Sequence, residues 1–305
     1  MKKKALQISA LLLLLTIGAA IGFNFLQAQT NPPALIVHPS NFDLSLKPGV
    51  VNTGAIYVMN TTKNTLTIQT HLRNFTAQGE EGGVNLTSEN TPYSLASWMQ
   101  VRPETATIPS GKEVKFTYTI TPPVNAEPGG HFGSVVFATV PTAIGNTGAA
   151  VSQEIASLFL ARIPGNAQES ALVESFTSDK PFYEFGPVTF TMRVKNNGNV
   201  HIQPFGAIEI TDMLGKKVDV PITPTNVLPN AVRKISTVFK SKLLIGKYKA
   251  TIIASYGSKN QPLEGTVIFY AFPIRYALLA LAILLVLFVM RKRLLKAVKT
   301  LITGK

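Results

Sequence analysis

The 305-residue chain contains no cysteine. This absence excludes disulfide bonds, thiol catalysis and cysteine-ligated metal sites. Small secreted domains without a sizeable core usually depend on disulfides. Any part of this chain outside the cell must therefore be held by ordinary apolar cores, which domains of about 100 residues or more can build.

Histidine is scarce as well. The chain has four histidines, His38, His71, His131 and His201. None has a second histidine at metal-ligand spacing, so we expect no metal and no cofactor. His131 differs from the others because Pro128-Gly129-Gly130 precedes it, and glycines let the backbone approach a ligand closely. The same glycines also suit a turn that enters a strand from Phe132 to Val140.

The carboxylates are scattered along the chain. A glycosidase needs two carboxylates that flank one bond at a defined separation, and no local pattern supplies such a pair. Glu80-Glu81 lies in a glycine-rich segment that is typical of a solvated loop. Because the sequence also has no signature of a nucleophile with its base, we expect a protein that is not an enzyme.

The positive charge is concentrated at the chain ends. The formal net charge is +13, but Lys2 to Lys4 and the tail from Arg291 to Lys305 supply nine of the positive charges. Residues 29–274 carry 19 Lys and Arg against 16 Asp and Glu. No compact basic stripe remains to contact phosphates, so nucleic acid is not an expected partner.

One long apolar run lies near the C-terminus. Phe272 to Met290 is almost purely apolar, and the run ends in basic residues: Arg291, Lys292, Arg293 and Lys296. Nineteen helical residues reach roughly 28 Å, close to the hydrocarbon thickness of a bilayer. Basic residues beside a span stay on the cytoplasmic side. These four residues therefore predict a single-pass membrane protein with the preceding chain outside and the tail inside.

A second apolar run lies at the N-terminus. Three lysines precede the stretch from Ala10 to Phe25, which is the layout of a secretory signal. Ala28 is the candidate cleavage point. An uncleaved anchor is the alternative, because the stretch is longer than the usual signal core.

Between the two runs, apolar and polar residues alternate. Val114 to Ile120 and Val188 to Lys195 show this period of two, which a strand with one buried face requires. Turn residues recur about every ten positions, which is typical of a β-sandwich. Asn196 to Asn199 and Asp212 to Gly215 have the composition of hairpin turns. We predict an all-β fold with two tandem immunoglobulin-like β-sandwich domains.

The domain boundary is expected near Ile163 to Ser170, because Pro164-Gly165-Asn166 interrupts a strand-like segment there. The predicted organisation is a signal peptide or signal anchor at 1–28, a first immunoglobulin-like domain at 29–165, a second at 166–270, a transmembrane helix at 271–290 and a basic cytoplasmic tail at 291–305.

Trp98 is the only tryptophan. An aromatic side chain on a β surface can stack on a sugar ring, which would make Trp98 part of a glycan platform. A sandwich core also needs a large aromatic residue, and we favour the core because aromatic side chains dominate core burial.

Several motifs occur in an order that resembles a known family. The first domain contains Leu35-Ile36-Val37-His38-Pro39, Tyr57-Val58-Met59-Asn60, and Pro122-Pro123-Val124-Asn125-Ala126-Glu127-Pro128-Gly129-Gly130-His131-Phe132-Gly133. The second contains Val194-Lys195-Asn196-Asn197-Gly198-Asn199 and Val227-Leu228-Pro229. This order is similar to that of the WxL-interacting surface proteins of Gram-positive bacteria. The resemblance implies that the first domain contacts peptidoglycan and the second contacts protein partners.

The expected function is therefore non-enzymatic binding at the cell surface. The partners would be peptidoglycan or another cell-wall glycan, a surface or exported protein, and the lipid bilayer. Loops of the first domain are the candidate ligand-binding site, with Tyr93, His131 and Phe132 as its residues. The alternative is a membrane-tethered chaperone or assembly factor that lends a strand to an exported chain. A cell-wall enzyme is a further alternative that the sequence favours less.

Overall fold

The computed structural model describes residues 33–140 and 152–303. The predicted signal segment at 1–28, with Ala28, lies outside the described residues. The chain separates into two units, Met1–Ala34 and Leu35–Lys305, and every element below belongs to the second unit.

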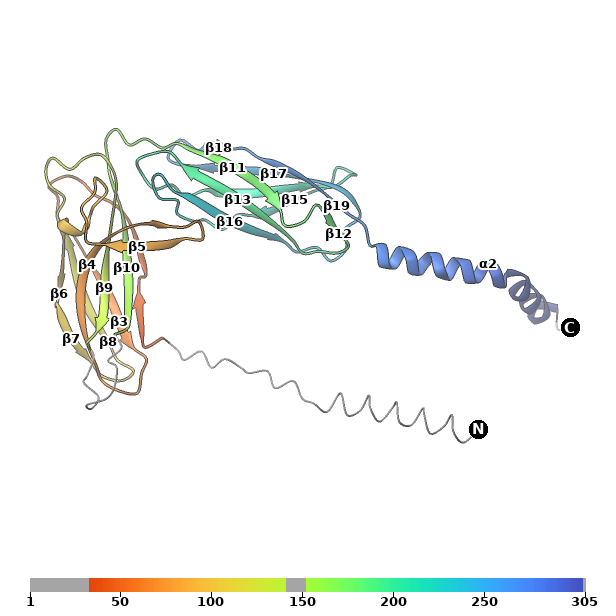
Figure 1. Cartoon of the computed structure of the whole chain (residues 1–305), viewed down its shortest axis with the longest axis horizontal. Coiled ribbons are helices and arrows are strands. Elements are labelled where there is room, and N and C mark those ends of the chain that lie inside the picture. The colour runs from red at the N-terminus through yellow and green to blue at the C-terminus, as the bar shows by residue number, and fades with distance from the viewer. Residues whose placement is uncertain (1–32, 141–151, 304–305) are drawn as a thin grey trace. The chain divides into compact units, whose positions relative to one another are not determined.

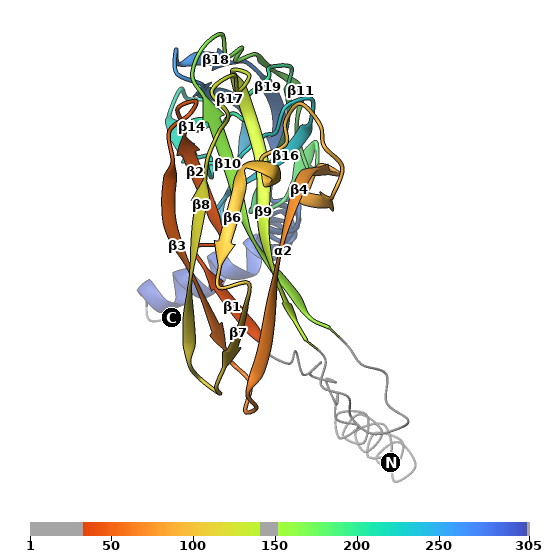
Figure 2. The same cartoon turned by 90° about the vertical axis from the view of Figure 1, so that its left-hand side faces the viewer.

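The first half of this unit is a sandwich of two sheets (Figures 1 and 2). One sheet has the order β1-β3-β8-β6, built from β1 (Leu35–His38), β3 (Asn52–Asn60), β8 (Glu113–Ile120) and β6 (Met99–Arg102). The other has the order β2-β10-β9-β4-β5, with β7 also paired to β4. Its strands are β2 (Asn41–Ser45), β10 (Glu154–Ile163), β9 (Gly129–Thr139), β4 (Leu66–Gln78), β5 (Gly83–Thr87) and β7 (Thr105–Ile108). We call this part the first sandwich.

The second sandwich follows after the segment 164–170. Its smaller sheet has the order β11-β13-β16, from β11 (Ala171–Ser178), β13 (Val188–Asn196) and β16 (Val232–Phe239). Its larger sheet has the order β12-β19-β17-β14-β15, with β18 paired to β17. These strands are β12 (Phe182–Tyr183), β19 (Thr266–Ala271), β17 (Gly246–Tyr256), β14 (Phe205–Thr211), β15 (Lys217–Pro221) and β18 (Gln261–Leu263).

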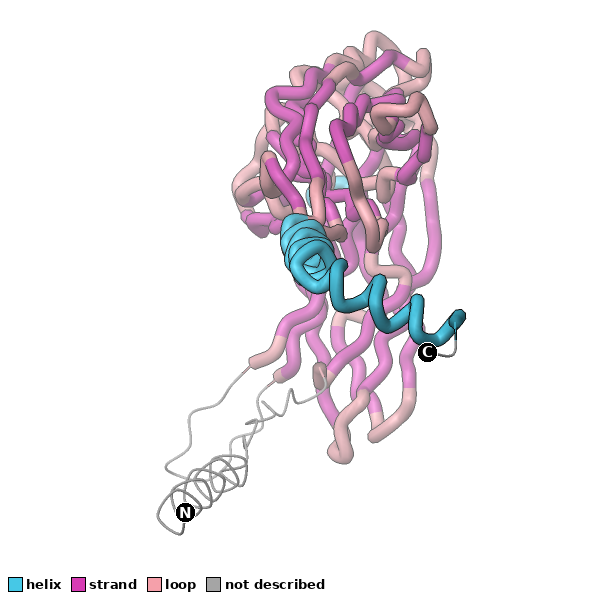
Figure 3. Tube along the Cα trace, turned by 90° about the vertical axis from the view of Figure 1, so that its right-hand side faces the viewer, coloured by secondary structure: helices cyan, strands magenta, loops and turns pink. Residues whose placement is uncertain are grey.

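Alternating side chains build a separate apolar core in each sandwich. Along β13 the residues alternate strictly between buried and half-buried, as the sequence pattern predicts. Phe116 and Phe137 are fully buried in the first core, and Phe190 and Phe269 in the second. Before the C-terminal helix, the described residues contain only one short helix, η1 (Ala96–Trp98) (Figure 3). The all-β prediction is confirmed.

In both sandwiches the chain enters one sheet and then crosses to the other. In the first, β1 pairs with β3, and β2 then runs parallel to β10 in the opposite sheet. In the second, β11 pairs with β13, and β12 then runs parallel to β19. The second and last strands of each sandwich are therefore neighbours.

A buried asparagine ends a strand in each sandwich. The Nδ2 group of Asn60 donates to the carbonyl oxygens of Asn64 and Ile108, at 2.7 and 2.9 Å. The Nδ2 group of Asn196 donates to the carbonyl oxygens of Val200 and Val227, both at 2.8 Å. Both asparagine side chains are completely buried. Each amide satisfies backbone groups that the sheets leave unpaired at that point.

This use of Asn196 corrects the prediction of a hairpin at Asn196 to Asn199. The segment instead connects β13 to β14, which lie in different sheets, and none of its residues has a positive φ. The predicted hairpin at Asp212 to Gly215 is confirmed, because β14 and β15 pair on either side of it and Gly215 has φ +82°.

The last element is helix α2 (Ile274–Thr303). Its segment Ile274–Arg291 is long and apolar enough to cross a membrane, and none of it is buried in the protein. The helix continues beyond Met290 through the basic residues Lys292, Arg293 and Lys296. The guanidinium carbon of Arg291 lies 4.3 Å from the centre of the Phe288 ring.

Candidate functional site

The β4–β5 hairpin of the first sandwich reaches the second sandwich (Figure 1). Two hydrogen bonds join the carboxylate of Glu80, at the tip of the hairpin, to the guanidinium of Arg193, at 2.6 and 2.8 Å. Arg193 also pairs with Glu174 at 3.0 Å. The side chain of Lys234 donates to Glu81 at 3.1 Å. The guanidinium of Arg193 thus binds the Glu80 carboxylate in the bidentate geometry that makes guanidinium–carboxylate pairs strong and specific.

The backbone joins the same contact. The N–H of Lys234, on the edge strand β16, donates to the carbonyl oxygen of Glu80 at 2.9 Å. Edge strands expose unpaired N–H groups, and here the hairpin satisfies one of them. Gly82 has φ +90°, and the guanidinium of Arg233 lies where a Cβ of residue 82 would be, 1.5 Å from Nη1. A side chain at residue 82 would therefore have to displace the Arg233 guanidinium.

Replacing Gly82 by alanine is therefore expected to release the hairpin. The new methyl group would displace the Arg233 guanidinium, and the left-handed backbone would add about 1 kcal/mol of strain. We expect faster hydrogen exchange at the amide of Lys234. Gly79→Ala is the matched control, because Gly79 in the same turn also has a positive φ, +61°, but no atom lies within 4 Å of its Cβ position. Equal exchange in the two variants would contradict this account.

A second set of contacts joins the two sandwiches near the segment 164–170 that connects them. Arg162, at the end of β10, pairs with Glu169 at 2.7 Å and donates to the carbonyl oxygen of His201 at 3.1 Å. The Nε2 atom of His201 lies 3.1 Å from a carboxylate oxygen of Asp43. The N–H of Gly130 donates to the carbonyl oxygen of Asn199 at 2.8 Å. Together with the hairpin, these contacts form what we call the junction.

The pKa values of three junction carboxylates, those of Glu80, Asp43 and Glu169, are lower than usual. The hydrogen bond from Arg193 lowers the pKa of Glu80 below its ordinary value of 4.5. The hydrogen bond with His201 lowers the pKa of Asp43 below 3.8. When the pKa of a carboxylate is lower in the folded protein than in the unfolded chain, its ionised form stabilises the fold. This stabilisation is fully present above the pKa of the unfolded chain, and it is lost as the pH falls through the pKa of the folded protein.

The junction should consequently loosen only in acid. We expect the protection of the Lys234 amide, corrected for the intrinsic pH dependence of exchange, to be constant at neutral pH and to fall below about pH 4. Hydrogen exchange measured across this range checks the prediction. In Glu80→Gln the carboxylate is absent, so a fall of the same size in that variant would assign the effect to other groups.

A small apolar cluster lies at the centre of the junction. Phe75, Phe132 and Leu160 are each almost fully buried, and Leu228 of the second sandwich packs against them. The rings of Phe132 and His201 meet edge to face, with centroids 5.8 Å apart. The two sandwiches thus share apolar contacts in addition to ion pairs.

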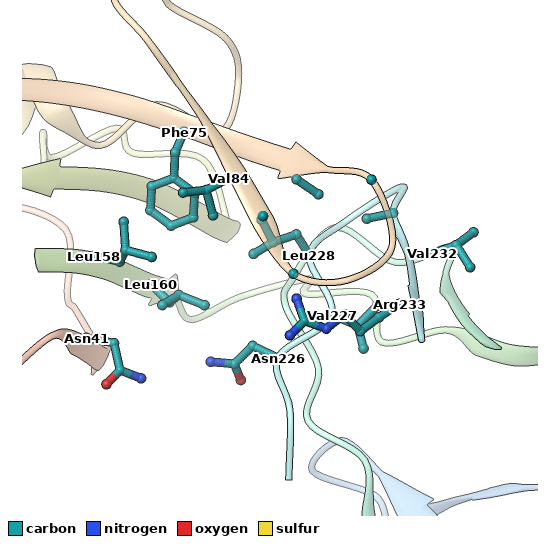
Figure 4. A pocket seen from close by; sticks show the side chains of 15 residues that line it. Asn41, Phe75, Val84, Leu158, Leu160, Asn226, Val227, Leu228, Val232 and Arg233 are labelled. Carbon is teal, nitrogen blue, oxygen red and sulfur yellow. The ribbon is translucent and has the colours of Figure 1, made fainter. Parts of the chain in front are cut away.

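Beside this cluster is a groove of about 210 Å³ (Figure 4). Most of its walls are apolar, from Phe75 and Val84 on the hairpin, Leu158 and Leu160 on β10, and Val227, Leu228 and Val232 of the second sandwich. Asn41, Asn226 and Arg233 supply its polar groups. We call it the junction groove. Within the described chain, the Oδ1 atom of Asn226 and the Nε atom of Arg233 are buried and have no hydrogen-bond partner.

The structure brings the three predicted binding residues together next to the junction. His131 and Phe132 are both 3% exposed, and Tyr93 is half-buried. The ring nitrogens of His131 lie 3.2 Å from the carbonyl oxygen of Ser94 and 3.0 Å from that of Glu127. The rings of Tyr93 and Phe132 are 6.3 Å apart. In this structure His131 and Phe132 hold loops in place, and a role of the three residues in binding stays a prediction.

A more open cleft of about 370 Å³ lies on the other side of His131. Its lining is about equally polar and apolar, and its polar residues include Asn90, Ser97, Asn125 and Glu127. Trp98 is half-buried at this cleft: it packs against the first core, and its ring lies 4.4 Å from that of His131. The structure therefore places Trp98 partly in the core and partly at a surface cleft.

The sequence did not predict the charged residues that build the junction. Glu80-Glu81 was expected in a solvated loop, and nothing local connects Glu80 to Arg193, which is 113 positions away. The repeated glycines around this acidic pair were the available signal, because they permit a tight tip that approaches another surface closely. The described residues contain no group of histidine and acidic side chains that would hold a metal ion.

No family model matches this chain, and no curated protein matches it. Solved structures do resemble it. The class 5 fimbriae chaperone CfaA is 15% identical to this chain, with a TM-score of 0.37. The match covers 77% of this chain and 98% of CfaA. The Escherichia coli chaperone DraB is 12% identical, with a TM-score of 0.36, and the match covers 77% of this chain and 94% of DraB. A chain of the CsuC–CsuE chaperone–tip adhesion subunit complex of Acinetobacter baumannii is 13% identical, with a TM-score of 0.36. The match covers 78% of this chain and 99% of that chain. These values are too low to transfer a function to this chain.

Proposed function

We propose that this chain is a non-enzymatic binding protein, anchored in the cell membrane by α2, that holds an extended segment of an exported or surface protein in the junction groove. The sandwiches lie outside the cell, and the basic end of α2, with Arg291, Lys292, Arg293 and Lys296, lies in the cytoplasm. Of the functions expected from the sequence, this proposal is closest to the chaperone or assembly factor.

The observation that carries the proposal is the pair of unpartnered polar atoms in an apolar groove. Buried polar atoms are nearly always hydrogen-bonded, and Asn226 offers an acceptor while Arg233 offers a donor. A peptide group has one N–H and one C=O, which are the types of partner that Asn226 Oδ1 and Arg233 Nε lack. The volume of about 210 Å³ is smaller than a typical small-molecule pocket, and suits one or two apolar side chains of a longer ligand.

Short synthetic peptides drawn from exported proteins provide the probe. We expect apolar peptides to bind the full chain in detergent micelles and to lose binding when Leu228→Asp places a charge in the groove. Val124→Asp is the matched control, since Val124 is 85% exposed and does not line the groove. Equal binding by both variants, or no binding of any peptide, would overturn the proposal.

The cleft beside Trp98 supports a second candidate, the binding of a cell-wall glycan. Amide and hydroxyl groups around an aromatic ring are the usual components of a sugar site, and this cleft combines Asn90, Asn125 and Ser97 with Trp98. Recovery of the full chain on isolated cell walls tests it. We expect Asn125→Ala to reduce recovery and Leu228→Asp to leave it unchanged; recovery that is insensitive to Asn125→Ala would reject this candidate.

The motifs quoted above also lead us to propose membership of the WxL-interacting surface proteins, with peptidoglycan at the first domain and a protein at the second. Protease applied to intact cells tests the topology that all these functions need. Digestion of both sandwiches with protection of the end of α2 is expected. Protected sandwiches would overturn the extracellular assignment.

A further inference from the structure

The second sandwich presents one end to the start of α2. Strand β19 ends at Ala271, and only Phe272 and Pro273 separate it from the helix. Gly246, the first residue of β17, pairs with Ala271. The loop 240–245, which leads into Gly246, therefore lies beside the point where the chain enters α2.

The hairpin turn 212–216 lies at the same end. It joins β14 to β15, and Thr211 pairs with both Lys217 and Lys249 of the neighbouring strands. The turn then continues toward Gly246, where a Cβ would lie only 2.2 Å from the sulfur of Met213. The loop 240–245 and the turn 212–216 are thus adjacent, and we call them together the tip.

The tip exposes large apolar side chains. Leu214 is 86% exposed, Met213 64%, Leu243 60% and Ile245 49%. Single exposed apolar residues are ordinary on a protein surface, but a group of them marks an interaction site. Leu244, between Leu243 and Ile245, is only 1% exposed. The loop is therefore fixed to the core by Leu244, and its two neighbours are held outward.

Four lysines lie in the tip or next to it in the sequence. Lys216, Lys240, Lys242 and Lys247 are exposed, and in the part of the chain that the structure describes none of them is seen in an ion pair. Asp212 is the acidic residue of the tip, and its carboxylate accepts the N–H groups of Leu214 and Lys216 within the turn. Exposed apolar side chains together with unpaired lysines fit an interface between water and anionic lipid.

The first turn of α2 is also attached to this end. Arg275 pairs with Glu184 at 3.1 Å, and the rings of Tyr276 and Phe185 meet edge to face at 5.4 Å. These contacts and the two-residue connection limit the distance between the tip and the lipid that α2 would enter. The charge and the apolar side chains thus lie where a bilayer surface would be.

We propose that the tip binds the outer surface of the membrane, with Leu214 and Leu243 between the lipid headgroups and the lysines on lipid phosphates. This inference rests on the proposed membrane anchoring by α2. It assigns to the second sandwich a fixed position on the bilayer surface.

The test uses the absence of cysteine, which makes any introduced cysteine a unique labelling site. Single-cysteine variants Leu214→Cys and Leu243→Cys of the full chain carry an environment-sensitive fluorophore and are reconstituted in vesicles of phosphatidylcholine and phosphatidylglycerol. We expect blue-shifted emission and quenching by lipids with a spin label near the headgroup. Val124→Cys, in the first sandwich, is expected to show neither.

Leu284→Cys, within α2, separates the inference from its premise. One outcome is that a probe at residue 284 is quenched by a spin label deep in the bilayer while the probes at residues 214 and 243 are not quenched. That result would overturn the proposed lipid contact of the tip but would support the anchoring by α2. An unquenched probe at 284 would overturn the anchor and, with it, this inference. As a second measurement, Lys240→Gln with Lys242→Gln should weaken quenching at residue 214 in anionic vesicles; unchanged quenching would reject the role of the lysines.

Discussion

Replacing Asn196 by alanine is expected to destabilise the second sandwich strongly. The substitution leaves the carbonyl oxygens of Val200 and Val227 and the N–H of Gly198 without the partner that the side chain provides. Each unsatisfied buried group costs about 1–3 kcal/mol, so a loss of about 3 kcal/mol or more is expected. For a domain of about 100 residues this lowers the unfolding midpoint by at least about 12 °C.

Thermal unfolding of the full chain in detergent micelles measures this effect. Asn197→Ala is the matched control, because the neighbouring side chain is exposed and the backbone N–H that donates to Ser170 is retained. Asn60→Ala should produce a comparable loss in the first sandwich, where the same arrangement occurs. Equal midpoints for the 196 and 197 variants would show that the buried amide does not hold the strands together.

Replacing Phe132 by alanine is the second large effect that we expect. The ring is 3% exposed and contacts Phe75, Tyr93 and His201, at centroid distances of 5.7, 6.3 and 5.8 Å. Loss of a buried phenylalanine side chain costs about 3–5 kcal/mol, through lost burial and the cavity left behind. Because His201 belongs to the second sandwich, the junction should loosen in addition to the loss of stability in the first sandwich.

Two measurements separate these consequences. Denaturant unfolding reports the stability of the first sandwich, and hydrogen exchange at Lys234 reports the docking of the hairpin. Phe205→Ala is the control for loss of an aromatic side chain, since Phe205 is 45% exposed and should cost well under 1 kcal/mol. Destabilisation by Phe132→Ala without any change at Lys234 would show that the cluster supports the first sandwich alone.

The strands were predictable because alternation reports a local property. In Val114 to Ile120 and Val188 to Lys195, every second side chain must be apolar if one face of the sheet is buried. The structure places both segments in strands, β8 and β13. The pattern says nothing about which strands become neighbours, so the parallel pairing of β2 with β10 was not visible in the sequence.

The candidate site was much less predictable, since it depends on pairs that are distant in sequence. Glu80 resembles any acidic loop residue until the fold brings Arg193 next to it. Asn196 illustrates a different failure: an asparagine followed by Asn-Gly is typical of a tight turn, but here the strand crosses to the other sheet and its amide is buried. Turn propensity is local, whereas the need for a buried hydrogen-bonding side chain is set by the tertiary structure.

The parallel neighbours β12 and β19 have a mechanical consequence for a tethered protein. The N–H groups of Tyr270 and Phe272 donate to the carbonyl oxygens of Pro181 and Tyr183, at 3.0 and 2.9 Å. Tension that enters the second sandwich at β11 and leaves through α2 pulls these two strands in opposite directions along their length. The hydrogen bonds are then loaded together in shear instead of opening one after another, so the proposed anchor would join the second sandwich at a mechanically resistant point.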